Sequence, residues 1–272
     1  MTIITILLFI LVFLYLILLF PRLSQRRRMF KSCPRMFAHR GYHDISLGIP
    51  ENSMPAFRIA VQRGYGIELD LHLTRDGRLV VFHDDTLKRM CGYQRTVEDM
   101  TYEELKKYPL LNTSEHIPLF EEVLSEVDGH VPLLIELKIP GRSIKICEKT
   151  YNILKNYRGD YLIQSFNTIG LRWFRIHAPN VLRGQLSSHL TTENTKESWI
   201  LRFLVQSLLC NVIGRPDFVS YKLSDLPTPS VMILKHLFRL PVAVWTLKTD
   251  KALKRGIAGY DIQIFEKPCE IY

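Results

Sequence analysis

Charged residues are absent from the first part of the chain. Between Thr2 and Phe20 there is no Asp, Glu, Lys or Arg, and nearly every residue is Ile, Leu, Val or Phe. As a helix this segment would span about 28 Å, close to the thickness of the hydrocarbon core of a bilayer. A cleaved signal peptide would need a basic residue before the apolar run and small residues after it, and the sequence has neither. We therefore predict a transmembrane anchor over residues 2–20.

Acidic residues are absent from a longer stretch, residues 1–35. The six basic residues in this stretch are Arg22, Arg26, Arg27, Arg28, Lys31 and Arg35. The whole chain has 36 basic and 27 acidic residues, so residues 36–272 hold 30 basic against 27 acidic ones. A nucleic-acid-binding protein would spread its basic excess over a folded face, and we predict no nucleic-acid partner. Residues 21–35 are predicted to be a basic linker that places the rest of the chain on the cytoplasmic side of the cell membrane, as a single-pass protein.

Cysteines are few. The chain has five, an odd number, and no two are spaced as CxxC. This pattern favours neither a disulfide framework nor a structural zinc site. Nothing in the sequence indicates a protein partner.

Short apolar runs recur at helix-sized intervals. We predict strands at 35–38, 66–73, 79–83, 132–138, 161–165, 181–186, 218–221, 242–247 and 261–265. Helices are expected between most of them, which predicts a parallel α/β fold and, from the strand count, a TIM (β/α)₈ barrel over residues 36–272. Nine runs are one too many for eight positions. The tight turn at Asp76-Gly77 leaves no room for a helix, so one of its two flanking runs is expected to extend beyond the barrel. Residues 89–117 are predicted to be a small insertion near one rim.

Two of the predicted strands carry charged residues at alternate positions. Glu68 and Asp70 share one face of their strand, and Glu136 and Lys138 share one face of theirs. A charge on a buried face is costly unless it is paired or bound to a metal. One such strand is compatible with a structural ion pair, whereas two favour a site. Because no Cys or His adjoins the three carboxylates, a hard divalent cation, Mg²⁺ or Ca²⁺, is expected rather than zinc.

Two histidines end other strands of the predicted barrel. His39 follows the first strand and His83 ends the third, so both would emerge at the rim that carries the carboxylates. A pair of histidines across an anion can supply a general base and a general acid. Arg40 and Lys138 offer the positive charge that a phosphate needs. The other seven histidines are predicted to be core or surface residues.

Taken together, these motifs and several others make the sequence resemble a known family, the glycerophosphodiester phosphodiesterases. The motifs that carry the resemblance are His39-Arg40-Gly41, Pro50-Glu51-Asn52-Ser53, Ala56-Phe57, Glu68-Leu69-Asp70, Thr74-x-Asp76-Gly77, Val80-Val81-Phe82-His83-Asp84, Ile117-Pro118, Glu136-Leu137-Lys138, Ser165-Phe166 and Trp245-Thr246. They run in the family's order from about residue 36 to the C-terminus. The resemblance implies a TIM barrel with a small insertion after the third strand.

The resemblance also implies roles for individual residues. His39 and His83 would be the acid–base pair, Glu68, Asp70 and Glu136 the metal ligands, and Arg40 and Lys138 the phosphate contacts. Glu51 lies in a matching loop and is a weaker substrate-pocket candidate, while Asn52 is expected to hold that loop. Trp245 either walls the pocket or belongs to the core.

The chain departs from the family pattern in two places. The last strand reads Tyr260-Asp261-Ile262-Gln263-Ile264-Phe265-Glu266, and Leu247-Lys248-Thr249 replaces another familiar sequence. Both segments are expected to lie outside the metal and histidine set and to affect substrate choice.

The resemblance predicts hydrolysis of glycerophosphodiesters to sn-glycerol 3-phosphate and an alcohol, with a metal and two histidines at a membrane surface. A lysophospholipase D that acts on lysophospholipids is a second hypothesis. The apolar segment 199–213 would then enter the lipid interface, although an outer barrel helix packed on the sheet is the more ordinary interpretation. A third hypothesis is an inactive, membrane-tethered binding domain.

Overall fold

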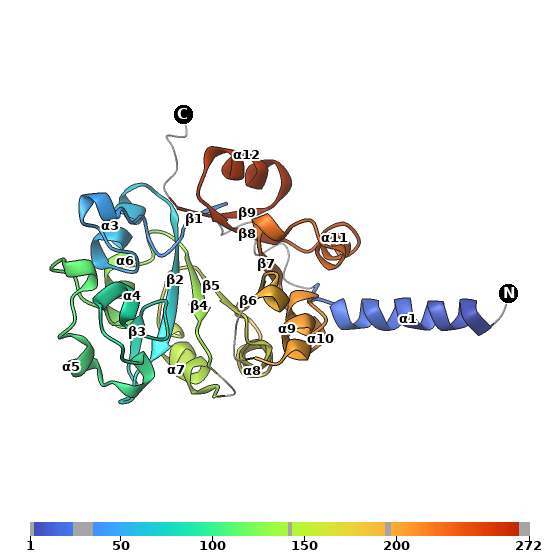
Figure 1. The fold of residues 1–272 in the computed structure, drawn as a ribbon, viewed down its shortest axis with the longest axis horizontal. Coiled ribbons are helices and arrows are strands. Elements are labelled where there is room, and N and C mark those ends of the chain that lie inside the picture. The colour runs from blue at the N-terminus through green and yellow to red at the C-terminus, as the bar shows by residue number, and fades with distance from the viewer. Residues whose placement is uncertain (1–2, 24–34, 141–142, 194–196, 267–272) are drawn as a thin grey trace.

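Eight parallel strands close into a barrel in the computed structural model, which describes residues 3–23, 35–140, 143–193 and 197–266 (Figure 1). The barrel strands are β1 (Met36–Ala38), β2 (Gly66–Leu73), β4 (Leu133–Leu137), β5 (Tyr161–Ser165), β6 (Leu182–Ser187), β7 (Phe218–Lys222), β8 (Val242–Leu247) and β9 (Ile262–Phe265). They follow the order β1-β9-β8-β7-β6-β5-β4-β2, and β1 pairs with β2 to close the ring. The predicted TIM barrel is confirmed.

The ninth strand, β3 (Leu79–Val81), is the run that lies outside the barrel. It pairs antiparallel with the end of β2 after the tight turn at Asp76-Gly77. Gly77 has a φ of 76°, a left-handed conformation that glycine adopts without a steric cost. The strand count from the sequence is thus reconciled, because a hairpin extends β2 beyond the barrel.

Helices cover the outside of the barrel. Their bounds are α3 (Met54–Gln62), α6 (Phe120–Val127), α7 (Lys145–Leu154), α8 (Thr168–His177), α9 (Trp199–Gln206), α10 (Asn211–Gly214), α11 (Pro229–His236) and α12 (Asp250–Gly259). Between β3 and α6 lie the short helices α4 (Lys88–Cys91) and α5 (Tyr102–Leu105), which pack on an apolar cluster of their own around Phe82, Met90 and Leu105.

The barrel interior has an apolar end and a polar end. The apolar end is filled by one cluster of side chains from seven strands, among them Phe37, Leu134 and Phe218. Leu134 and Glu136 are two residues apart on β4 and therefore share the inner face. The apolar cluster closes the amino-terminal end of the barrel, and charged side chains occupy the carboxyl-terminal end.

Helix α1 (Ile3–Leu19) projects from the side of the barrel (Figure 1). Its 17 residues, at 1.5 Å each, make it about 26 Å long, and a helix needs about 20 apolar residues to cross a bilayer. No helix among the described residues has the length and apolar character needed to span a membrane. The transmembrane helix predicted over residues 2–20 is therefore not supported. Most of the predicted basic linker, residues 24–34, lies outside the described residues.

Candidate active site

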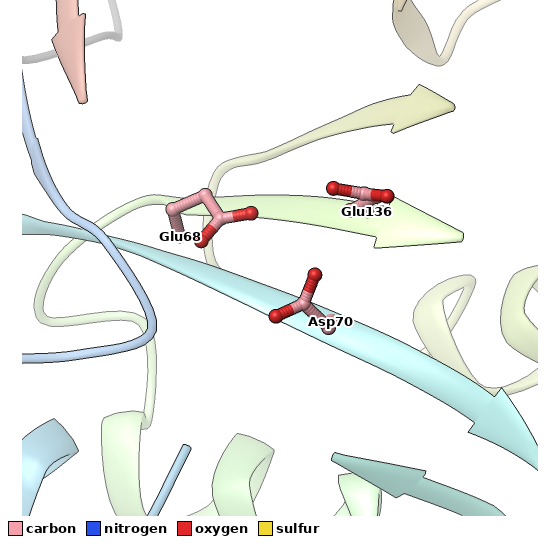
Figure 2. A group of neighbouring side chains, drawn as sticks. All are labelled: Glu68, Asp70 and Glu136. Carbon is pink, nitrogen blue, oxygen red and sulfur yellow. The ribbon is translucent and has the colours of Figure 1, made fainter. Parts of the chain in front are cut away.

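Three carboxylates converge at the polar end of the barrel. Glu68 and Asp70 extend from β2 and Glu136 from the neighbouring β4, where Asp70 and Glu136 are register partners (Figure 2). One oxygen from each residue lies within 4.8 Å of the others. All three residues are buried, with 7% exposure or less. The structure thus brings together the three residues that the sequence predicted as metal ligands.

Lys138 directly follows β4 and lies within this carboxylate group. Its Nζ is 3.0 Å from Asp70 Oδ1 and 2.5 Å from Glu136 Oε1. Burial acts to lower the pKa of Lys138, but the carboxylates of Asp70 and Glu136 outweigh it and raise that pKa. The ammonium is therefore charged, and it neutralises part of the negative charge of the site.

Glu68 is the carboxyl group of the three whose ionised form is least favoured by its surroundings. Burial and the neighbouring Asp70 and Glu136 raise its pKa well above the ordinary value. Asp70 behaves in the opposite way: burial acts to raise its pKa, but Lys138 and other cationic groups outweigh burial and hold it below its usual range. A buried carboxyl that resists ionisation beside two others is the electrostatic situation that a bound cation relieves.

The donor set fits a hard divalent cation. It consists of carboxylate oxygens alone, the ligands that Mg²⁺ and Ca²⁺ prefer. Asn52 orients the Asp70 carboxylate, since its Nδ2 donates to Asp70 Oδ2 at 3.0 Å. This contact matches the loop-holding role expected for Asn52.

The loop after β1 presents Arg40 to the site. Arg40 has a φ of 53°, and its backbone N–H donates to Glu68 Oε2 at 3.0 Å. Its side chain reaches Asp70, with Nε 3.5 Å from Oδ2. Gly41 follows with a φ of 79°, and a Cβ there would lie 2.9 Å from the Cβ of Ala56, so only glycine fits this approach to α3.

Each candidate histidine is held by a carboxylate. His39 Nδ1 lies 2.7 Å from Glu266 Oε1, and His83 Nδ1 lies 2.6 Å from Asp84 Oδ1. Because an ionised carboxylate can only accept, Nδ1 carries the proton in both rings and Nε2 is left as the reactive nitrogen. His39 Nε2 lies 4.0 Å from Glu68 Oε2, so it faces the carboxylate group.

Glu51, the weaker substrate-pocket candidate, lies in a group of ion pairs next to the site. Its carboxylate pairs with Arg40 Nη1 at 2.6 Å and with Arg89 Nη2 at 2.6 Å. Arg89 also binds Asp84, with Nε 2.7 Å from Oδ2. Glu51 and Arg89 therefore form a chain of ion pairs that links Arg40 to the carboxylate holding His83. Neither the role of Arg89 nor that of Asp84 was predicted.

Trp245 lies on β8 at the rim of the apolar interior cluster. Its ring is half-buried and meets Phe166 edge-on, with centroids 6.1 Å apart. The buried indole Nε1 has no hydrogen-bond partner among the described residues. The ring therefore packs on the interior cluster, and its role as a wall of the substrate pocket stays a prediction.

The residue after the last strand lies closer to the candidate site than the sequence predicted. Glu266, which was expected to lie outside the metal and histidine set, hydrogen-bonds His39, and Lys248 Nζ lies 2.8 Å from Glu266 Oε2. The physical reason is barrel closure: β9 pairs with β1, so the residue after β9 meets the residue after β1. The available signal was a charged residue directly after the apolar strand 262–265.

The sequence profile of the Glycerophosphoryl diester phosphodiesterase family matches residues 39–265. The chain belongs to this family. The match includes all the residues of the candidate site except Glu266.

Relatives in the glycerophosphoryl diester phosphodiesterase family cover part of the chain. A glycerophosphodiester phosphodiesterase of Caldanaerobacter subterraneus subsp. tengcongensis is 36% identical over 163 residues, 56% of this chain and 65% of that protein. A lysophospholipase D of Rattus norvegicus is 33% identical over 161 residues, 54% of this chain and 49% of that protein. The chain thus spans about half to two thirds of the length of the curated relatives it matches.

A solved structure supports the fold. A phosphodiesterase of Oleispira antarctica, in complex with the product sn-glycerol-3-phosphate, superposes with a TM-score of 0.70 at 24% identity. The alignment covers 86% of this chain and 93% of that one. This chain therefore shares its barrel fold with that phosphodiesterase.

Proposed function

We propose that this protein hydrolyses glycerophosphodiesters to sn-glycerol 3-phosphate and an alcohol. The observation that carries the proposal is the position of two carboxylate-held histidines at the buried group of Glu68, Asp70 and Glu136: His39 Nε2 lies 4.0 Å from Glu68 Oε2, and His83 interacts electrostatically with Asp70. Family membership supports the reaction class, and the printed names of relatives support the substrate class.

The proposed chemistry assigns one proton transfer to each histidine. One Nε2 removes the proton from the neighbouring glycerol hydroxyl as its oxygen bonds to phosphorus, and the other donates a proton to the alcohol as its bond to phosphorus breaks. Water then opens the cyclic phosphate with the two proton transfers reversed, so the net reaction consumes one water. Arg40 and Lys138 balance the negative charge that develops on the phosphoryl oxygens. Glu68, Asp70 and Glu136 would hold one divalent cation, Mg²⁺ or Ca²⁺, which when bound polarises a non-bridging oxygen.

Alanine variants of the two histidines test the proposal. H39A and H83A should each lose about 10²–10⁴-fold in kcat on glycerophosphocholine, the usual contribution of a positioned acid or base. The exposed His236, on the far end of α11, offers a matched control, and H236A should retain wild-type turnover. Near-normal turnover in both H39A and H83A would sink the assignment. No turnover by the wild type on any diester, with either metal added, would instead favour an inactive binding domain.

Lysophospholipase D activity is the second candidate function. It is favoured by the similarity to a relative of that name and by the apolar surface that α1 and α9 expose. The two reactions share their chemistry and differ in whether the glycerol carries an acyl chain. Measuring kcat/KM for glycerophosphocholine and for lysophosphatidylcholine on one preparation separates them, because a preference for either compound excludes the other as the main substrate.

We further propose that the protein acts at the cell membrane with its barrel on the cytoplasmic side. The support is the apolar α1 together with six basic and no acidic residues in the first 35. Protease treatment of intact cells and of inverted vesicles tests the orientation. The barrel should be cleaved only in the inverted vesicles, and cleavage in intact cells would overturn it.

A further inference from the structure

Helix α1 is attached to one particular side of the barrel. Its end lies between α10 and α11, where the Asn211 amide donates to the Leu19 carbonyl at 3.5 Å and Tyr15 Oη lies 3.0 Å from Ser230 Oγ. The ring of Phe20 meets that of Phe238 edge-on, with centroids 5.3 Å apart. From this side α1 projects away from the barrel (Figure 1), and its end packs on α10.

Helix α9, which precedes α10 by a short connection, exposes most of its apolar side chains. Among its eight residues only Val205 is buried, whereas Trp199 is 58% and Ile200 is 66% exposed. Trp199 and Phe203 stack on one another on the surface, with ring centroids 5.4 Å apart. Segment 199–213 is thus an outer helical segment of the barrel that packs inward through Val205 and Leu208, but most of the apolar area of α9 faces outward.

The exposed apolar side chains of the barrel concentrate on the same side. Fourteen large hydrophobic residues are exposed among the described residues of the barrel, and eight of them belong to α9, α10, and α11 with its C-cap. These eight, which we call the apolar face, are Trp199, Ile200, Leu201, Phe203, Leu204, Ile213, Met232 and Leu237. Single exposed apolar residues are ordinary on a protein surface, but a concentration of this kind marks an interaction site.

Basic side chains border the apolar face. The guanidinium of Arg215 lies 4.9 Å from the ring centre of Phe20, and Arg175 donates to the carbonyls of Val212 and Ile213 next to the face. The sequence of the first 35 residues is also basic, with six basic and no acidic residues. Two copies packed through this face would bring these cations together, whereas a surface of anionic headgroups would neutralise them.

We propose that the apolar face is a lipid-contacting surface, with the α9 side chains entering the headgroup region of an anionic bilayer around the base of α1. The barrel then contacts the membrane through its α9–α11 side, and not through α1 alone. Aromatic side chains such as Trp199 favour this depth because their rings are apolar and their edges are polar. The proposal deepens the membrane association proposed above and does not depend on which diester is hydrolysed.

Tryptophan quenching in the full-length protein tests the proposal directly. The protein is reconstituted into vesicles of phosphatidylcholine and phosphatidylglycerol, with or without bromine on the acyl chains, and its fluorescence is compared with that of W199F. Brominated lipid should quench the wild type, and W199F should lose most of the quenchable emission. The matched control is W173F, because Trp173 is half-buried on α8 against Tyr151 and should contribute little to the quenching.

Two results would overturn the proposal. One is equal quenching of W199F and wild type, which would place Trp199 in water. The other is quenching that is unchanged when phosphatidylcholine alone forms the vesicles, which would remove the role of anionic lipid. If Trp199 is instead shielded in a dimer of the reconstituted protein, the occupant is a second copy and the proposal is also wrong.

A double variant separates this surface from the catalytic proposal. W199S/F203S should hydrolyse glycerophosphocholine in solution at the wild-type rate, because both side chains are exposed and outside the candidate active site. Its reconstituted form should show less protection of α9 from proteolysis than the wild type does. If the wild type fails to hydrolyse glycerophosphocholine yet shows the Trp199 quenching, the catalytic proposal fails and the lipid surface stands.

Discussion

At the scale of single residues, the two histidines differ in their surroundings although both are held by a carboxylate. His39 is the more enclosed, and burial is the main cause of its lowered pKa. His83 is about a third exposed, and its partner Asp84 is also bound by Arg89. The tautomer of each ring follows from its carboxylate partner, so these partners are expected to govern activity without touching the substrate.

Glu266 offers a test of that positioning role. E266Q removes the negative charge opposite His39 Nδ1 and should lower kcat by about 10–100-fold while leaving KM near its wild-type value. E266D, which keeps the charge, should recover part of the loss. Steady-state kinetics on glycerophosphocholine measures both.

The control for Glu266 is its other partner. Lys248 is 63% exposed, and exposed ion pairs contribute about 0–1 kcal/mol, so K248A should change kcat little. An equal loss in K248A and E266Q would show that the Lys248 pair, and not the contact with His39, is what matters.

Glu266 also makes a prediction about acid stability. Burial acts to raise its pKa, but the hydrogen bond from His39 outweighs it and lowers the pKa from 4.5 to about 2. A carboxyl with a lowered pKa in the folded state contributes stability above pH 4.5 that is lost as the pH falls toward 2. In urea titrations, the wild type should therefore lose more stability than E266Q between those pH values. Parallel curves for the two proteins would contradict the shift.

At the scale of elements, the close packing of strands inside the barrel leaves no spare volume at certain glycines. Gly184 on β6 faces the ring of Phe218 on β7, and a Cβ there would lie 2.3 Å from the ring. G184A should therefore destabilise the barrel by about 1–3 kcal/mol, measured by denaturant unfolding. Gly259 at the end of α12 has nothing within 4 Å of its added Cβ, so G259A should be near neutral. Equal effects of the two substitutions would contradict this account of the packing.

The strands were predictable from the sequence, with bounds that differ by two residues at most. β2, β5 and β8 match the predicted ranges, because runs of apolar residues between turn signals are unambiguous there. The exposure of α9 was harder to predict, because eight mostly apolar residues are compatible with a buried helix and with a surface-exposed one. Periodicity predicts that a helix forms but not what surrounds it, and the neighbours of α9 are set by where α1 and α10 lie.

At the scale of the whole molecule, a divalent cation should tie the barrel together, because its three ligands belong to neighbouring strands. A cation that binds only the folded state at 100 times its Kd adds about 2.7 kcal/mol to the free energy of unfolding. Mg²⁺ or Ca²⁺ should raise the Tm, a chelator should reverse the rise, and the larger rise identifies the preferred ion. D70N should abolish the effect, and a Tm rise that persists in D70N would place the cation elsewhere.

The barrel, the candidate carboxylates and the candidate histidines could all be predicted from the sequence alone, because each depends on local order along the chain. A charged pair two residues apart shares one face of a strand, and a residue directly after a barrel strand emerges at one rim, wherever the other strands lie. Three other features could be seen only in the tertiary structure. They are the contact of Glu266 with His39, the ion pairs of Glu51 with Arg40 and Arg89, and the apolar face. Each of these joins residues that are distant in sequence, and only the closure of β9 on β1 and the seating of α1 between α10 and α11 bring them together.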